Sequence, residues 1–130
     1  MPKLSLPRPT DTELEILRAL WHRGPSTVRE VQETLGEARP TGYTTVLKML
    51  QIMTEKGLVR RDESQRAHVY EARLAQEQTQ QQLIGDLLER VFDGSATSLV
   101  MQALATKKKT SAEELSQIRQ IIDEFERGQR

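Results

Sequence analysis

The sequence has no cysteine, no net charge and only five aromatic residues among its 130. The absence of cysteine excludes disulfides, thiolate metal sites and cysteine nucleophiles. With zero net charge the whole molecule has no strong electrostatic preference, so any surface for nucleic acid must be local. The opening residues MPKLSLPRPT lack the apolar run of a signal peptide, and no stretch approaches the roughly 20 apolar residues of a membrane span. We therefore expect a cytoplasmic protein.

Motifs for catalysis and for cofactor binding are also missing. The sequence has no Gly-rich phosphate loop, no nucleophile motif and no clear pair of carboxylates. The two histidines, His22 and His68, are far apart in the sequence and have no neighbours that resemble metal ligands. We predict that the protein is not an enzyme and uses neither a metal nor a cofactor.

What the sequence does contain is a series of amphipathic helices separated by glycine and proline. Thr10 or Thr12 can cap a first helix, because each is followed by a glutamate three residues later. The segment HRGP ends this helix. Ser26 or Thr27 can cap a second helix, and Gly36 suits its end.

The third predicted helix covers about 41–56 and ends at Gly57. The periodicity changes after it. Two short apolar segments, at 58–59 and 69–70, flank the polar run RDESQRA, which is typical of a β-hairpin over 58–70. The predicted fold is therefore mostly α with a small β-hairpin wing, a winged helix-turn-helix domain at 1–73.

From residue 74 the composition becomes glutamine-rich and helical, which predicts a helical dimerisation region at 74–130. Its apolar faces are large for a small monomer and suit a homodimer interface, although an ordinary core within one chain is the alternative. A symmetric dimer predicts an operator with inverted-repeat symmetry. The predicted dimerisation residues are Leu83, Leu87, Leu88, Val91, Leu99, Val100, Ala103, Ile118, Ile121, Ile122 and Phe125.

Positive charge is concentrated on the third helix and the hairpin. Residues 39–68 hold six lysines or arginines against three acidic residues. One side of the helix is apolar, and the other side holds Thr44, Thr45, Lys48 and Gln51, none of which is acidic. A helix of this kind fits the major groove of double-stranded DNA, where its N-terminal residues meet base edges; a solvated helix face is the alternative. The predicted base-reading residues are Thr44, Thr45 and Lys48, with Gln51 as a marginal contact.

A second set of residues is predicted to hold the DNA backbone. These side chains are cationic or can form hydrogen bonds, and they lie near the start of the third helix or in the hairpin. Contacts of this kind position a protein and make its binding fall steeply with salt. The set consists of Arg39, Tyr43, Arg60, Arg61 and Arg66, and His68 could also reach the backbone or the minor groove. Thr41, at the start of the third helix, is a further predicted DNA-binding residue.

Three segments occur in a distinctive order and spacing, and they read TDTELEILRALW, YTTVLKMLQIMTEKGLVRR and HVYEA. They resemble the penicillinase-repressor family of bacteria, the BlaI, MecI and CopY-like regulators. The resemblance covers about residues 6 to 125. It implies a winged-helix dimer that represses genes, with 58–70 as the wing. It also implies that the recognition helix carries Tyr43, Thr44, Thr45 and Lys48.

Two departures from this family concern the signal that relieves repression. In antibiotic-responsive members, a membrane sensor-protease triggers cleavage at an Asn-Phe bond in an SLV-type helix. Here SLVMQALA has Gln102 and Ala103 at the matching positions, so the helix is retained and the cleavage site is not. Copper-responsive members use a C-terminal cysteine cluster, which this chain lacks. A sensor-protease partner, release by a small molecule, and a winged helix that binds protein are the alternatives that stay open.

Overall fold

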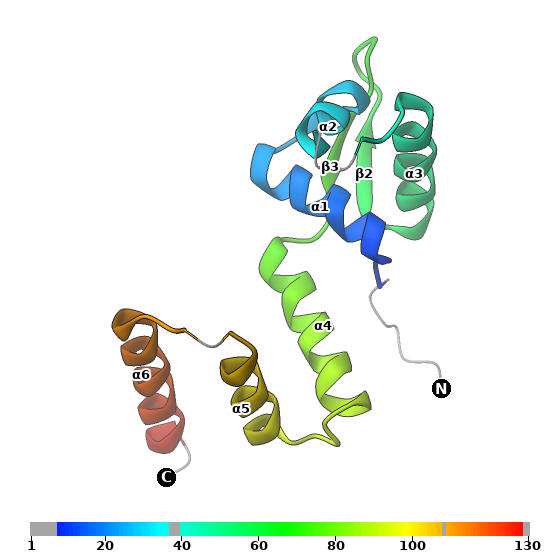
Figure 1. Ribbon diagram of the computed structural model, residues 1–130. Coiled ribbons are helices and arrows are strands. Elements are labelled where there is room, and N and C mark those ends of the chain that lie inside the picture. The colour runs from blue at the N-terminus through cyan, green and yellow to red at the C-terminus, as the bar shows by residue number, and fades with distance from the viewer. Residues whose placement is uncertain (1–7, 37–39, 108, 129–130) are drawn as a thin grey trace. The chain divides into compact units, whose positions relative to one another are not determined.

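The computed structural model describes residues 8–36, 40–107 and 109–128. The chain forms two compact units that divide after Gly85. Three helices, a small sheet and the first part of a fourth helix form the first unit, and the remaining helical residues form the second (Figure 1). The helices are α1 (Asp11–Arg23), α2 (Val28–Leu35), α3 (Tyr43–Lys56), α4 (Gln76–Arg90), α5 (Ala96–Lys107) and α6 (Ala112–Gly128). The strands are β1 (Ser26–Thr27), β2 (Val59–Asp62) and β3 (Val69–Ala72). This arrangement confirms the predicted fold class.

Side-chain caps determine where α1 and α2 begin. The Thr10 hydroxyl accepts a hydrogen bond from the backbone N–H of Glu13 at 3.2 Å, and the Glu13 carboxylate accepts one from the Thr10 N–H at 2.8 Å. Thr27 forms the same capping box at the start of α2. Each box satisfies two N–H groups that a helix start leaves without a partner. The alternative caps, Thr12 and Ser26, do not take this position.

The sheet is antiparallel, with the strand order β1-β3-β2. β2 pairs with β3 from Val59 opposite Ala72 to Asp62 opposite Val69, and β1 adds Thr27 opposite Val69. The sequence predicted the hairpin but not β1. A strand of two residues is too short for an alternating pattern, and its second residue also caps α2.

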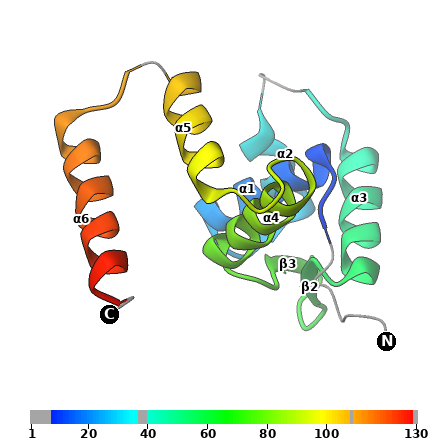
Figure 2. The same ribbon diagram turned by 90° about the horizontal axis from the view of Figure 1, so that it is seen from below.

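The core of the first unit lies between α1, α2, α3 and the sheet. Each helix contributes one apolar side, as its periodicity predicted. In both views α3 forms the outer edge of this unit (Figures 1 and 2), so only one side of the helix is used for packing. The buried cluster is made up of Ile16, Leu17, Leu20, Val28, Val31, Val46, Leu50, Met53, Leu58, Val59 and Tyr70.

An ion pair joins the start of α1 to the end of α3. The Lys56 ammonium lies 2.7 Å from the Glu13 carboxylate, and the Glu13 side chain is only 5% exposed, against 35% for Lys56. Burial raises the pKa of Glu13, but hydrogen bonds from Lys56 and Thr10 act in the opposite direction, and the net pKa lies below its usual value. Glu13 is therefore a buried carboxylate that is stabilised in its charged form.

A second polar contact ties α1 to the segment that leads into α4. The indole N–H of Trp21, which is partly buried, donates a hydrogen bond to the carbonyl of Leu74 at 3.0 Å. Further along, Thr79 of α4 is buried. The first part of α4 therefore belongs to the same compact unit as the winged helix.

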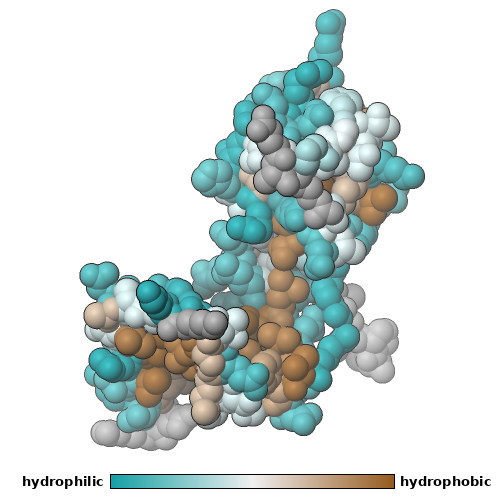
Figure 3. All heavy atoms as spheres, viewed as in Figure 1, coloured by the Kyte–Doolittle hydropathy of each residue, from teal (hydrophilic) through white to brown (hydrophobic). Residues whose placement is uncertain are grey.

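The tail helices α5 and α6 contain no buried residue. In the face drawn in Figure 3 the most hydrophobic residues gather over the tail, whereas the tip of the hairpin is hydrophilic. The Lys107 ammonium lies 2.8 Å from both carboxylate oxygens of Glu114, which links the end of α5 to the start of α6. In the described part of the chain, no helix combines the length and the hydrophobicity that a membrane crossing requires.

The ion pair makes the stability of the first unit depend on pH. Because the pKa of Glu13 is lower in the folded state, its charge stabilises the fold above the unfolded pKa of about 4.3, and this contribution is lost as the pH falls through the folded pKa. We expect Glu13→Gln to lower the free energy of unfolding at pH 7 by about 1–2 kcal/mol, since hydrogen bonds to charged groups contribute about 1.5–3 kcal/mol and solvent screens the Lys56 end.

Urea unfolding at pH 7 and at pH 3 tests this expectation. The difference between wild type and Glu13→Gln should shrink at the lower pH. Glu33→Gln, which changes an exposed glutamate on α2, is the matched control and should have little effect at either pH. An equal loss for Glu13→Gln at both pH values would show that the charge of Glu13 is not what stabilises the fold.

Candidate nucleic-acid interface

The two sides of α3 differ sharply in chemistry. Val46, Leu50 and Met53 are completely buried. The side that faces solvent is polar and has no acidic residue between Tyr43 and Thr54. The structure places all four predicted base-reading residues on exposed positions of this helix: Thr44, Thr45, Lys48 and Gln51.

The start of α3 differs from the starts of α1 and α2. Its N-cap is Gly42, which gives no side-chain hydrogen bond to the helix, and its first turn has no acidic residue. The first N–H groups of α3 therefore have no side-chain cap among the described residues. They keep the partial positive charge of a helix N-terminus, which attracts phosphate. Just before α3, Thr41 is tied to α2, because the Gln32 amide donates a hydrogen bond to the Thr41 carbonyl at 3.1 Å.

The hairpin presents its two adjacent arginines on opposite faces. Arg60 lies opposite Glu71, and Arg61 lies opposite Tyr70. Successive strand residues point to opposite sides of a sheet, so the side chains of Arg60 and Arg61 leave the hairpin on different faces. The guanidinium of Arg61 also lies 3.3 Å from the carboxylate of Glu63.

The turn of the hairpin is ordered by an acidic residue. The Asp62 carboxylate accepts a hydrogen bond from the Ser64 N–H at 2.9 Å. Hydrogen bonds from the side chain and backbone of Ser64 lower the pKa of Asp62, so the carboxylate is charged at neutral pH. The hairpin is therefore not uniformly basic, and its cations act at particular positions.

A hollow of about 380 Å³ lies between the starts of α2 and α3 and the hairpin. Its lining includes Tyr43, Arg66 and His68, which the sequence assigned separately to the helix and the wing. It also includes Arg29 of α2, which no pattern in the sequence singles out. The guanidinium carbon of Arg29 lies 5.9 Å from the centre of the Tyr43 ring, within the range of a cation–π contact. Spacing in the sequence gives no sign of this contact, because the two residues belong to different helices.

Two predicted DNA-binding residues remain, Thr41 and Arg39. Thr41 precedes α3 and is partly buried. Arg39 lies outside the described residues. The exposed members of the set within the described residues are Tyr43, Arg60, Arg61, Arg66 and His68.

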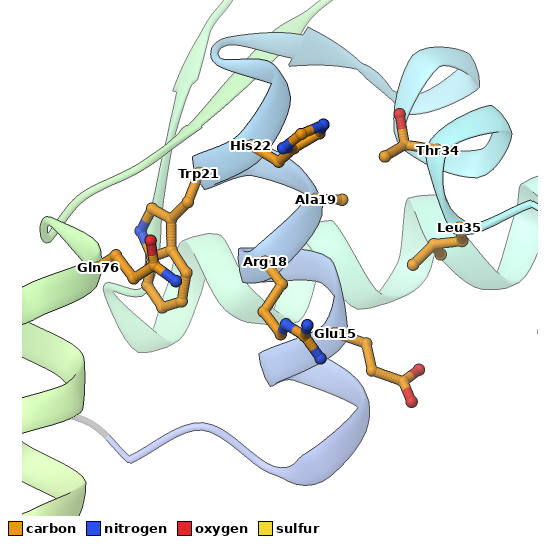
Figure 4. Close-up of a pocket in the computed structure, with 8 residues that line it drawn as sticks. All are labelled: Glu15, Arg18, Ala19, Trp21, His22, Thr34, Leu35 and Gln76. Carbon is orange, nitrogen blue, oxygen red and sulfur yellow. The ribbon is translucent and has the colours of Figure 1, made fainter. Parts of the chain in front are cut away.

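A second hollow, of about 860 Å³, lies beside α1 and is lined by residues of both charge signs. Figure 4 shows Trp21 and Gln76 at one end and Thr34 and Leu35 at the other. Glu15 lies with the cationic Arg18 in the same lining. Because the lining has both charge signs, it lacks the uniform positive character of a nucleic-acid surface. The exposed side of α3 and the hairpin are the better candidate.

Gln102 and Ala103, the positions that match the cleavage site of antibiotic-responsive repressors, are exposed residues of α5. The Gln102 carbonyl accepts a hydrogen bond from the Thr106 hydroxyl at 2.7 Å, and its amide donates to the Ser98 hydroxyl at 3.4 Å. Both positions thus lie within a regular helix. The described residues contain no group of three histidines, aspartates or glutamates that could hold a metal ion.

Comparison with known proteins gives the family. The model of the penicillinase repressor family matches residues 9–124. The chain belongs to this family. Its members are DNA-binding transcriptional repressors and are not enzymes. This confirms the prediction of a transcriptional repressor and the prediction that the protein is not an enzyme.

Individual relatives are similar over nearly the whole chain. The transcriptional regulator BlaI of Mycobacterium tuberculosis H37Rv is 31% identical over 124 residues, which cover 95% of this chain and 88% of the relative. The penicillinase repressor of Bacillus licheniformis is 24% identical over 119 residues, 92% of each chain. Among solved structures, monomeric BlaI of Bacillus licheniformis in complex with the blaP half-operator is 23% identical, with a TM-score of 0.49. That match covers 56% of this chain and 89% of the other.

Proposed function

We propose that the protein is a homodimeric repressor that binds an inverted-repeat operator in double-stranded DNA. In this proposal residues 1–73 form the DNA-binding domain and residues 74–130 form the dimerisation region. The recognition helix lies within 41–56 and enters the major groove, and the wing at 58–70 contacts the backbone. The observation that carries the proposal is the exposed side of α3, which has no carboxylate over three turns and begins at an N-terminus without a side-chain cap.

The proposed base contacts follow from the chemistry of each side chain. Thr44 and Thr45 lie in the first turn of α3, where a hydroxyl can bond a base edge and a methyl can touch thymine. Lys48 follows one turn later and suits the acceptors of guanine. Gln51 lies one turn further along the helix and is the more marginal contact.

The remaining exposed groups suit the sugar-phosphate backbone. Arg60 and Arg61 emerge on opposite faces of the wing, so each serves a different phosphate. Tyr43, Arg66 and His68 share the hollow beside the start of α3. Backbone contacts fix the position of the helix in the groove and carry no sequence information themselves.

Exposed apolar residues of α4, α5 and α6, the helices of the tail region 74–130, support the homodimer. On α4, Ile84, Leu87 and Val91 are 50%, 39% and 66% exposed and recur at helical spacing. Most monomers do not leave apolar stripes of this kind in water, and a second copy would cover them. On α6 and α5, further exposed apolar residues are Ile121, Ile122, Phe125, Val100 and Met101. Ile84 and Met101 extend the set that the sequence predicted.

One substitution of a lysine and one of an arginine distinguish base reading from backbone binding. We expect Lys48→Ala to reduce the preference for operator over random DNA by about 10- to 100-fold, because a good base contact discriminates by about 1–3 kcal/mol. We expect Arg61→Ala to weaken binding to both DNAs alike and to lower the slope of log affinity against log salt by about 1. Fluorescence anisotropy over a salt series measures both effects.

The DNA for this experiment is the region upstream of the protein's own gene, with random DNA as control. Arg119→Ala, an exposed arginine of α6, is the matched control variant and should leave both affinities unchanged. If Lys48→Ala and Arg61→Ala were folded and bound both DNAs as wild type does, the assignment of this surface would be wrong. Absence of wild-type binding to any DNA at low salt would favour a winged helix that binds protein.

A pair of tail substitutions tests the dimer. Leu87→Asp combined with Ile122→Asp places two charges on apolar stripes, so we expect monomers and weaker operator binding, because each half-site is then bound separately. Sedimentation velocity measures the mass, with Gln81→Asp and Gln117→Asp, at exposed polar positions of the same helices, as control. A Leu87→Asp, Ile122→Asp variant that still sediments as a dimer would contradict this interface.

A further inference from the structure

The hollow beside the start of α3 combines a cationic rim with an apolar floor. Arg29 comes from α2, Tyr43 from α3, and Arg66 and His68 from the hairpin. The floor is made of Val28, Leu47 and Tyr70, of which Val28 and Tyr70 are buried. None of the described residues that line it is acidic.

Arg29 has no carboxylate partner among the described residues. The nearest acidic residue in the sequence, Glu30, is engaged elsewhere: it accepts a hydrogen bond from the Thr27 N–H at 2.9 Å and pairs with Arg23 at 2.9 Å. These hydrogen bonds, first that from Thr27 and then that from Arg23, lower the pKa of Glu30, so its charge is satisfied at the cap of α2. The contact of Arg29 is instead the face of the Tyr43 ring.

The guanidinium of Arg29 lies over the face of the Tyr43 ring, with its carbon 5.9 Å from the ring centre. A contact with the face of a ring does not use the N–H donors of the guanidinium, so these donors remain available to a ligand. Such a group suits a phosphate, which it can bind with two parallel hydrogen bonds. The apolar floor suits the carbon atoms of a deoxyribose. A free inorganic anion has no apolar part that could contact this floor. Together the two halves of the hollow match one sugar-phosphate unit.

We infer that this hollow holds one sugar-phosphate of the operator strand next to the groove that α3 enters, with Arg29 as its phosphate-binding residue. The inference rests on the proposed function, because it requires α3 to lie in the major groove. Tyr43 is the first residue of α3, and Thr44 and Thr45 follow it directly. A phosphate held against the Arg29–Tyr43 pair therefore fixes how the base-reading threonines are placed along the DNA.

Substitution of Arg29 tests the inference. We expect Arg29→Ala to weaken binding to operator and to random DNA by a similar factor of about 10 to 100, because hydrogen bonds to charged groups are worth about 1.5–3 kcal/mol. The slope of log affinity against log salt should fall by about 1. Arg29→Lys should recover only part of the affinity, since lysine cannot form the paired hydrogen bonds. Arg18→Ala, an exposed arginine of α1, is the control and should bind as wild type does.

Neutral methylphosphonates, placed one at a time along each strand of the operator, identify the phosphate. One position should weaken wild-type binding and have no further effect on Arg29→Ala, because the substitution and the modification remove the same contact. If Arg29→Ala weakened binding but every modification had the same effect on both proteins, the assignment of Arg29 to a phosphate would be overturned.

Parallel measurements with Lys48→Ala separate this inference from the proposed function. If Lys48→Ala lost sequence preference while Arg29→Ala kept full affinity and the wild-type salt slope, the hollow would have no role and the proposed function would stand. If wild type bound neither operator nor random DNA, both would fail. Circular dichroism of each variant verifies that it is folded, which we expect because Arg29 is exposed.

Discussion

Val46, Leu50 and Met53 are completely buried, and their packing fixes the rotation of α3 about its own axis. Adjacent residues of a helix are separated by about 100° around the axis. A shift by two positions would turn Lys48 toward the core, where an unpaired charge is strongly unfavourable. The polar side of α3 can therefore face only outward. The base-reading role that we propose for this helix depends on this constraint, because the core and the interface use opposite sides of the same 14 residues.

Two acidic residues of the first unit, Glu13 and Glu30, support the fold from the starts of α1 and α2, away from the exposed side of α3. Glu13 closes the capping box of α1 and pairs with Lys56, and Glu30 closes the capping box of α2 and pairs with Arg23. Both carboxylates lie in a first helical turn, where the helix dipole favours them. α3 begins instead at Gly42, and glycine as a cap sacrifices only a few tenths of a kcal/mol relative to a side-chain cap. A protein with zero net charge thus keeps one helix start free for an anion.

The parts of this structure that the sequence predicted are those set by local periodicity. The capping boxes, the apolar side of α3 and the hairpin all follow from residues within a few positions of one another. The cation–π contact of Arg29 with Tyr43 and the strand β1 depend on how distant segments pack, and neither leaves a pattern in the chain. The separation of Arg60 from Arg61 could have been predicted from strand alternation once β2 was assigned. The candidate site was therefore predictable on α3, where one helix contains it, and only in part where three elements meet.

The exposed apolar residues of the tail suggest how a protein with a small DNA-binding surface could reach a useful affinity for DNA. One winged helix has a single short helix and one wing for contact, and the first unit has only a slight positive excess, since residues 1–73 hold twelve lysines or arginines against ten acidic residues. We expect such a unit to bind a half-site weakly, whereas two linked units would bind in sequence with a high effective concentration for the second. A tail that pairs through Leu87, Ile122 and Phe125 would therefore supply affinity without adding positive charge, and it would make operator binding depend on protein concentration. Any event that separates the tails would then release the DNA while leaving both winged helices intact.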